Sequence, residues 1–185
     1  MDYQVIARQS VTLENFNDSG LILDLGGGGE GVVGQLKGSQ VIAVDPNLEE
    51  LKETPPGPQK VVMDARQLLV PDQIFQTVTS FFTLMYIKSS DHQQIFRESF
   101  RVLSPQGKFL IWDVEWPADV VQKEDIGVIF LEVVLPDRTI ETGYGTHWPQ
   151  KKINTEYYQK LAVEIGFKIG RTESAGAIFF LELIK

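Results

Sequence analysis

Apolar and polar positions divide the first two thirds of the chain into alternating strands and helices. Short apolar runs bounded by turn-forming residues predict five strands, at residues 21–25, 40–45, 60–64, 75–82 and 108–114. Between them, apolar residues at helical spacing or short capped segments predict helices near residues 30–36, 47–51 and 90–103. Strands and helices that alternate in this way form a parallel, doubly wound sheet.

The pattern changes after this α/β part. Two β-type runs, residues 128–135 and 139–142, flank a Pro-Asp turn and predict a β-hairpin within an insertion of about residues 116–152. An amphipathic helix then starts at Asn154 or Thr155. Residues 167–172 and 177–184 follow as strands whose link is too short for a crossover helix, so we expect an antiparallel C-terminal hairpin.

The N-terminal segment and the length of the chain together predict a single domain. Residues 1–20 are mixed in character, and we expect an arm or a short helix that packs beside a ligand site. A chain of 185 residues can bury one full core but is too short for a nucleotide domain plus a separate substrate domain. We therefore expect one α/β domain over residues 1–185, which disfavours the usual two-domain dehydrogenase.

A glycine-rich turn follows the first predicted strand and supplies the main functional signal. Asp24 and Leu25 end that strand, and four consecutive glycines, residues 26–29, come next. Their backbone freedom suits a tight turn that exposes N–H groups to an anionic ligand. About twenty residues later the second strand ends in Asp45, where a carboxylate can accept hydrogen bonds from two ribose hydroxyls. The two features together predict a nucleoside-containing cofactor.

The spacing alone leaves the cofactor open. Gly26, Gly28 and Gly31 also fit the G-x-G-x-x-G pattern of dinucleotide binding. A dinucleotide and S-adenosylmethionine are both compatible with the glycine turn and Asp45.

Composition narrows the function classes. The formal net charge of −8 argues against a sequence-independent grip on nucleic acid or on an anionic membrane surface. The chain has no cysteine, and its two histidines, His92 and His147, are far apart, so we expect no disulfide, thiolate nucleophile or metal site. The N-terminus shows neither a secretory signal nor a membrane-spanning run, which predicts a cytoplasmic protein.

The order of elements and four motif positions resemble the class I S-adenosylmethionine-dependent methyltransferases, from residue 21 to residue 185. Asp24 and the glycines that follow resemble the first motif of that family, and Asp45 occupies the position of its ribose-binding acid. Asp64-Ala65 matches the third-strand position, and residues 101–107 resemble the segment before strand five, with Gln106 in place of a glycine. Two positions depart from the family pattern, Glu30 at the third glycine and Gln76 after the aromatic residue that opens strand four.

The resemblance implies S-adenosylmethionine as cofactor and assigns its contacts. The glycine turn would cradle the methionine part, Asp24 would orient its amino group, Asp45 would hold the ribose, and Asp64 with Ala65 would bracket the adenine. The residues implied to bind the cofactor are Asp24, Gly26, Gly27, Gly28, Asp45, Pro46, Asp64, Ala65, Ser80 and Phe81.

Methyl transfer from a sulfonium is a direct displacement, so the protein mainly has to align the acceptor with the S–CH3 bond. Phe81 and Phe82 would lie near the methyl group, where an aromatic face stabilises a cation, although either could be a core residue. As general base or acceptor contact the candidates are His147, Asp113 and Tyr86. His147 could instead be a loop residue bonded to backbone, Asp113 a satisfied strand-end acid, and His92 is expected at the surface.

The acceptor is predicted to be a small molecule. Residues 80–83 lack the Asn/Asp-Pro-Pro-Tyr motif with which family members methylate base amines, and the acidic charge also disfavours nucleic acid. The insertion hairpin, with its apolar run at residues 128–131, is predicted either to cap the substrate or to pair two subunits as a homodimer. The alternatives are a non-catalytic S-adenosylmethionine-binding protein and an NAD(P)-dependent oxidoreductase.

Overall fold

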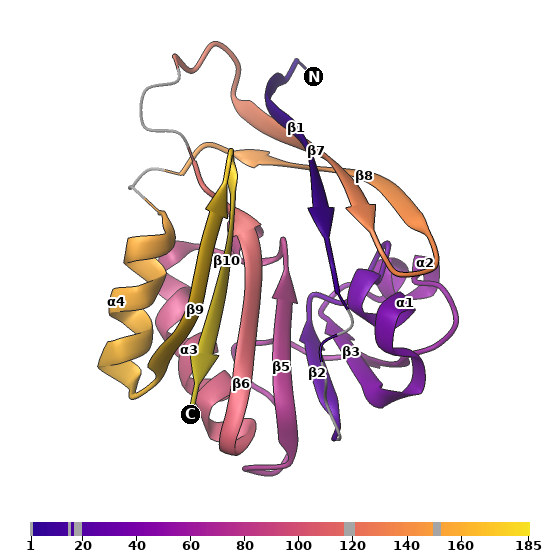
Figure 1. The fold of residues 1–185 in the computed structure, drawn as a ribbon, viewed down its shortest axis with the longest axis vertical. Helices are drawn as coiled ribbons and strands as arrows, with labels where there is room; N and C mark the ends of the chain where they lie inside the picture. Colours follow the sequence, from indigo (N-terminus) through magenta and orange to yellow (C-terminus); the bar gives the residue numbers. More distant parts are fainter. Residues whose placement is uncertain (1, 15, 17–19, 117–120, 150–152) are drawn as a thin grey trace.

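The main sheet has seven strands in the order β4-β3-β2-β5-β6-β10-β9 (Figure 1). The computed structural model describes residues 2–14, 16, 20–116, 121–149 and 153–185. The strands from β4 to β6 are parallel, whereas β10 is antiparallel to both β6 and β9, as the short link before β10 predicts. Their bounds are β2 Ile22–Leu25, β3 Val41–Asp45, β4 Gln59–Val62, β5 Phe75–Phe81, β6 Leu103–Val114, β9 Lys168–Ala175 and β10 Ile178–Ile184.

Helices cover both faces of this sheet. Four α-helices are described, α1 Val32–Lys37, α2 Leu48–Glu53, α3 Ser89–Val102 and α4 Thr155–Ile165, with short 3-10 turns η1 at Gly38–Gln40 and η2 at Leu84–Tyr86. The side chain of Asn154 accepts a hydrogen bond from the Tyr157 N–H, so the predicted N-cap of the last helix is confirmed. The α/β fold with its C-terminal antiparallel hairpin is therefore confirmed.

Successive side chains of each buried strand enter two different cores. Leu23 and Leu25 of β2 pack with α3 and α4 in one core, while Ile22 packs with α1 in the other. Both faces of β2 are buried, which explains its continuous apolar run.

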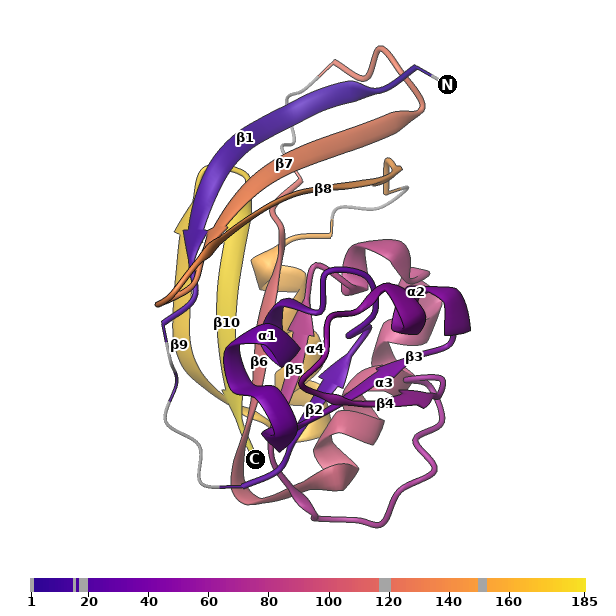
Figure 2. The same cartoon turned by 90° about the vertical axis from the view of Figure 1, so that its right-hand side faces the viewer.

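A second, three-stranded sheet lies across the carboxyl end of the main sheet (Figure 2). It has the order β1-β7-β8, with β1 Gln4–Thr12, β7 Ile126–Val134 and β8 Thr139–His147. β7 pairs antiparallel with β8 along its length and parallel with β1.

The N-terminal segment is thus a strand, and the expectation of an arm or short helix beside the ligand site is wrong. Residues 4–12 pair with β7 more than 110 residues later, from Gln4 opposite Gly127 to Thr12 opposite Val134. Such a pairing satisfies the backbone groups on one edge of β7, and local sequence carries no signal for a partner so distant.

The apolar side chains of β7 pack against other parts of the same chain. Ile129 and Leu131 are buried in the same core as Val32 and Val33 of α1. This burial removes much of the apolar surface on which the prediction of a homodimer through the hairpin was based.

Candidate functional site

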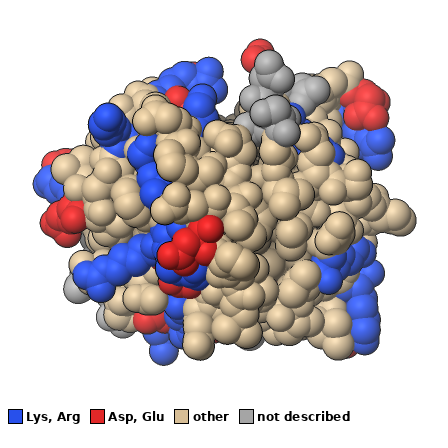
Figure 3. Space-filling model, turned by 90° about the horizontal axis from the view of Figure 1, so that it is seen from below, with Lys and Arg blue, Asp and Glu red and all other residues tan. Residues whose placement is uncertain are grey.

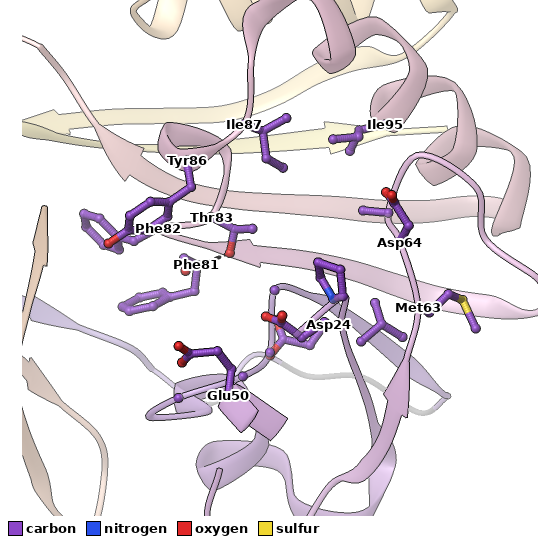
Figure 4. Close-up of a pocket in the computed structure, with 18 of the residues that line it drawn as sticks. Asp24, Glu50, Met63, Asp64, Phe81, Phe82, Thr83, Tyr86, Ile87 and Ile95 are labelled. Atoms are coloured by element: carbon purple, nitrogen blue, oxygen red, sulfur yellow. Dashed lines mark hydrogen bonds between the residues drawn. The ribbon is translucent and has the colours of Figure 1, made fainter. Parts of the chain in front are cut away.

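A cavity of about 950 Å³ opens at the carboxyl ends of β2, β3, β4 and β5, and β8 closes one side of it. Ligands of open α/β sheets bind at this edge, where loops between strands and helices leave a crevice. Figure 4 shows Asp24 near the middle, Met63, Asp64 and Ile95 toward one end, and Glu50, Phe81, Phe82 and Tyr86 toward the other. Gly143 and Tyr144 of β8 also line the cavity.

The floor of the cavity is the glycine turn. Gly26 has φ +68°, and a Cβ there would lie 2.3 Å from Thr83 Cγ2, so only glycine fits without strain. A Cβ on Gly28 would lie 2.6 Å from Glu50 Cβ and 2.9 Å from Asp45 Oδ2. The bare backbone therefore lets two carboxylate side chains come close to the turn, as the run of glycines predicts.

Asp24 is a buried carboxylic acid that reaches the cavity. One oxygen, Oδ1, accepts a hydrogen bond of 2.7 Å from Thr79 Oγ1 on β5. Burial raises the pKa of Asp24 to about 7; the Thr79 hydrogen bond opposes this rise and the charge of Asp45 adds to it. A cationic group bound beside Asp24 would favour its charged form.

Asp45 ends β3 and also lines the cavity, next to Pro46. Its Oδ1 accepts a hydrogen bond of 2.8 Å from the Asn47 N–H, which holds the side chain at the entrance of α2. Its Oδ2 is the atom that faces Gly28. The position suits the predicted ribose-binding role, because one carboxylate oxygen is directed toward the glycine turn.

Asp64 and Ala65 line the far end of the cavity, just after β4. The Arg66 guanidinium lies 2.6 Å from Asp64 Oδ2 and 3.0 Å from Asp91 Oδ2, so it bridges two acids. Its hydrogen bonds to the Asp64 carboxylate hold the pKa of Asp64 below its usual value. Asp64 therefore stays ionised and fixed in place.

The end of β5 brings two aromatic side chains to the cavity. The rings of Phe81 and Phe82 are 4.9 Å apart, and Phe82 stacks on Tyr144 with centroids 5.1 Å apart. Phe82 adopts φ +50°, which turns the chain sharply at this point. Ser80, by contrast, is fully buried outside the cavity lining, with no hydrogen-bond partner for its hydroxyl among the described residues.

The structure brings only one of the three catalytic candidates to the cavity. Tyr86 lines it, and the Tyr86 hydroxyl accepts a hydrogen bond of 3.2 Å from the Gly145 N–H. Asp113 is buried beneath the η2 turn, where it accepts a hydrogen bond from the Met85 N–H. His147, at the end of β8, is exposed outside the cavity lining and lies 3.2 Å from the Asp125 carbonyl oxygen.

His92 is buried, and the expectation of a surface histidine is wrong. One ring nitrogen lies 3.2 Å from the Tyr157 hydroxyl, and the other lies 3.1 Å from the Ile87 carbonyl oxygen. Burial lowers the pKa of His92, so the ring is neutral at pH 7. The side chain ties α3 to the segment after β5 and to α4, contacts that a single helical pattern does not reveal.

Several residues that line the cavity were not predicted as site residues, among them Glu30, Glu50 and Tyr144. Glu30, Glu50 and Tyr144 come from the glycine turn, α2 and β8. The only sequence signal was Glu30 itself, a charged residue at a position where the family has glycine. Glu50 looks like an ordinary exposed helical residue. Tyr144 lies in β8, on the insertion that was predicted either to cap the substrate or to pair two subunits, but nothing in the sequence marked Tyr144 itself.

The cavity lies in an α/β fold whose acids Asp24, Asp45 and Asp64 stand at or just beyond the carboxyl ends of three adjacent parallel strands, where such folds bind ligands. A family model described as a methyltransferase domain matches residues 23–111. No curated protein sequence matches the chain.

Solved structures share the fold over most of the chain. An S-adenosylmethionine-dependent methyltransferase from Mesorhizobium loti has 15% identity and a TM-score of 0.63, over 92% of this chain and 94% of that one. One from Methanosarcina mazei has 17% identity, a TM-score of 0.63 and the same coverage. The glycopeptide N-methyltransferase MtfA, solved with S-adenosylmethionine, has 15% identity and a TM-score of 0.62, over 91% of this chain and 88% of that one.

At these identities the solved structures establish the fold, and the family model carries the assignment. The match of residues 23–111 to a methyltransferase domain, together with the shared fold, supports a class I S-adenosylmethionine-dependent methyltransferase. It is an enzyme whose cofactor is S-adenosylmethionine.

The residues of the cavity fit that cofactor. S-adenosylmethionine carries two positive charges, and the cavity has Asp24, Asp45 and Glu50 around the glycine turn. Asp24 is buried without a cationic partner among the described residues, which is costly unless a cation binds there. Within the described residues no group of three or more His, Cys, Asp or Glu could hold a metal ion.

Proposed function

We propose that this enzyme transfers the methyl group to a small-molecule acceptor that enters between η2 and β8. The supporting observation is the cavity itself, which extends from Asp64 past Asp24 to an aromatic wall at Phe82, Tyr86 and Tyr144. The part near Asp64 and Asp45 suits the adenosine, and the part near Tyr86 leaves room for a second molecule. No described helix has the length and apolar character needed to cross a membrane.

Particular residues would hold the cofactor. In this proposal Asp24 binds its amino group, the turn of Gly26, Gly27 and Gly28 lies against its methionine part, and Asp45 binds the ribose hydroxyls. Pro46, Asp64, Ala65 and Phe81 complete the contacts, whereas Ser80 is left out because it lies outside the cavity lining.

When bound, S-adenosylmethionine would supply an electrophilic methyl group: the acceptor's lone pair would form the new bond while the C–S bond broke with its electron pair going to sulfur. The protein's task is to orient the acceptor and exclude competing water, since alignment alone supplies about 7 to 11 kcal/mol in the best intramolecular cases. Phe81, Phe82 and Tyr144 form the apolar side of that space. The Tyr86 hydroxyl, held by Gly145, is the proposed polar contact to the acceptor.

A small-molecule acceptor also agrees with the charge distribution. The chain has a net charge of −8, and the cavity contains more acids than bases. Figure 3 shows the face away from the second sheet, where Lys and Arg lie toward the sides and uncharged residues fill much of the centre. A polyanion such as nucleic acid would be repelled by the cavity.

The alternatives predict different ligands. An oxidoreductase would bind a nicotinamide dinucleotide, whereas a non-catalytic protein would bind S-adenosylmethionine without turning it over. We retain small-molecule transfer because the cavity continues beyond the adenosine part to Tyr86 and Tyr144.

Calorimetry with Asp45→Ala tests the cofactor site. The change should weaken S-adenosylmethionine binding by about 1–3 kcal/mol, the cost of a lost buried hydrogen-bond partner. Asp137→Ala, at the exposed turn between β7 and β8, is the matched control and should bind as the wild type does. Equal affinities of the two variants would contradict the ribose role of Asp45.

Turnover is measured as release of S-adenosylhomocysteine with a panel of small amines, alcohols, thiols and carboxylates. Acceptor-dependent release supports transfer to a small molecule. Tight binding of S-adenosylmethionine with no release on any acceptor would favour the non-catalytic alternative.

A further inference from the structure

We infer that the acceptor is an amine, held as a cation by Glu30 and Glu50 against the aromatic wall of the cavity. This inference rests on the proposed function and names the chemical class of its acceptor. It is drawn from the end of the cavity opposite Asp64, where β8, η2 and the glycine turn meet.

Glu30 is a carboxylate held in place from the second sheet. Thr142 Oγ1 donates a hydrogen bond of 2.6 Å to Glu30 Oε1, and the Tyr144 hydroxyl lies 3.4 Å from Oε2. Burial and the charge of Glu30 raise the pKa of Tyr144, so its hydroxyl stays protonated and donates. Both hydroxyl groups are uncharged, so they hold the Glu30 carboxylate in place without forming an ion pair with it.

Glu50 lies on the same side of the cavity, beside Gly28 and Gly29. Its pKa is raised by partial burial and by the charges of Glu53, Asp45 and Glu30. Glu30 and Glu50 therefore repel each other across the opening. Among the described residues neither forms an ion pair with Lys, Arg or His.

The aromatic wall points to the same kind of ligand. Phe82 and Tyr144 stack with an interplanar angle of 12°, and Phe81 meets Tyr144 edge-on with centroids 6.4 Å apart. Aromatic faces attract cations and not anions. A cavity end that combines such faces with unneutralised carboxylates selects a cationic head group on an apolar body.

The two basic residues of the cavity lining do not neutralise the carboxylates of Glu30 and Glu50. Arg66 is engaged with Asp64 and Asp91 at the adenine end. Lys88 is exposed and forms no ion pair with Glu30 or Glu50. An anionic acceptor would meet net repulsion where the reaction has to occur.

Methyl transfer to an amine at this site accounts for every proton, bond and charge. The ammonium form binds and loses one proton to water or to a neighbouring carboxylate, leaving a free lone pair on nitrogen. That lone pair would form the N–C bond as the C–S bond breaks with its electron pair going to sulfur, so the positive charge would move from sulfur to nitrogen. Glu30 and Glu50 stabilise the charge that develops on the nitrogen, and a proton then leaves the product to solvent.

The test uses a cation that cannot react, so that binding is read apart from turnover. Protein saturated with S-adenosylhomocysteine is titrated by calorimetry with trimethyl(2-phenylethyl)ammonium, with the uncharged 2-phenylethanol and with 3-phenylpropanoate. We expect the cation to bind best. Glu30→Gln and Glu50→Gln should each weaken binding of the cation about three- to tenfold, because the ion pairs that it would form with these two carboxylates are partly solvated. Glu49→Gln removes the same charge from α2 outside the cavity, where Glu49 pairs with Lys52, and should leave binding unchanged.

The outcomes separate this inference from the proposed function. Equal or weaker binding of the cation than of the other two probes, including no binding of any, overturns the inference. It is also overturned if Glu30→Gln and Glu50→Gln lower the affinity for S-adenosylmethionine relative to S-adenosylhomocysteine but leave the cation unaffected, because the carboxylates would then serve only the sulfonium. Methylation of alcohols or carboxylates but not amines would sink the amine assignment and leave the proposed function standing.

Discussion

Two buried aspartates near strand ends have pKa values that are shifted in the same direction, but their surroundings differ. Burial raises the pKa of Asp24 and of Asp113 to about 7. Asp24 reaches the cavity, whereas Asp113 receives hydrogen bonds from the Met85 and Val114 N–H groups. Both were predicted from strand-end positions, and the sequence could not separate a ligand contact from a residue that holds the η2 turn.

Asp113 should make the stability of the protein fall as pH rises. Its pKa is about 7 in the folded state and near 3.8 when unfolded, so between these values only the folded state holds the proton. The contribution of Asp113 to the free energy of unfolding therefore decreases between about pH 4 and pH 7, by up to about 1.4 kcal/mol per pH unit. Above pH 7 this contribution no longer changes. Asp113→Asn should reduce the loss measured by urea unfolding between pH 5 and pH 8.

The control for this measurement is Asp125→Asn, which removes an exposed carboxylate. It should keep the wild-type dependence on pH. An Asp113→Asn protein with an unchanged pH slope would mean that Asp113 is ionised in the folded state.

At the scale of elements, the prediction succeeded where the signal was local. The run from Ile22 to Leu25, the glycines and the short C-terminal link each encode their structure within a few residues. The hairpin of the second sheet was predicted, but its pairing with β1 was missed because β1 and β7 are brought together only by the folded chain. One of the two predicted roles of the hairpin was to cap the substrate, but the sequence did not show that Tyr144 of β8 would line the cavity.

The second sheet should be part of the same cooperative unit as the main sheet. Ile129 of β7 is fully buried in the core that contains Val32, Val33 and Ile22. Ile129→Ala should lower the free energy of unfolding by about 2–5 kcal/mol, through lost burial and the cavity left behind. Urea unfolding followed by tryptophan fluorescence measures it, because Trp116 and Trp148 pack together beside β7.

Val163→Ala is the matched control, since Val163 is exposed on α4. It should change stability by less than about 0.5 kcal/mol. If Ile129→Ala behaved like this control, the second sheet would have to be only loosely attached.

At the scale of the whole molecule, the sequence predicted more of the residues in the half of the cavity proposed for the adenosine than in the half proposed for the acceptor. Asp24, Asp45 and Asp64 lie at or just beyond the carboxyl ends of strands that local sequence patterns predict. The acceptor half combines Glu30, Tyr86 and Tyr144 from segments that are up to 114 residues apart. Function at that end depends on packing between the two sheets, which no local pattern specifies.

Cofactor binding should raise the thermal stability of the whole protein, because a ligand that binds only the folded state shifts the unfolding equilibrium. At a concentration 100 times its dissociation constant, S-adenosylhomocysteine should contribute about 2.7 kcal/mol. For a chain of 185 residues this corresponds to a rise in Tm of roughly 5–11 °C, at about 2–4 °C per kcal/mol. NAD+ at the same concentration should leave Tm unchanged, Asp45→Ala should reduce the shift, and Asp137→Ala should retain it. A shift with NAD+ as large as that with S-adenosylhomocysteine would instead indicate that the glycine turn and Asp45 bind nucleosides without selecting the sulfonium cofactor.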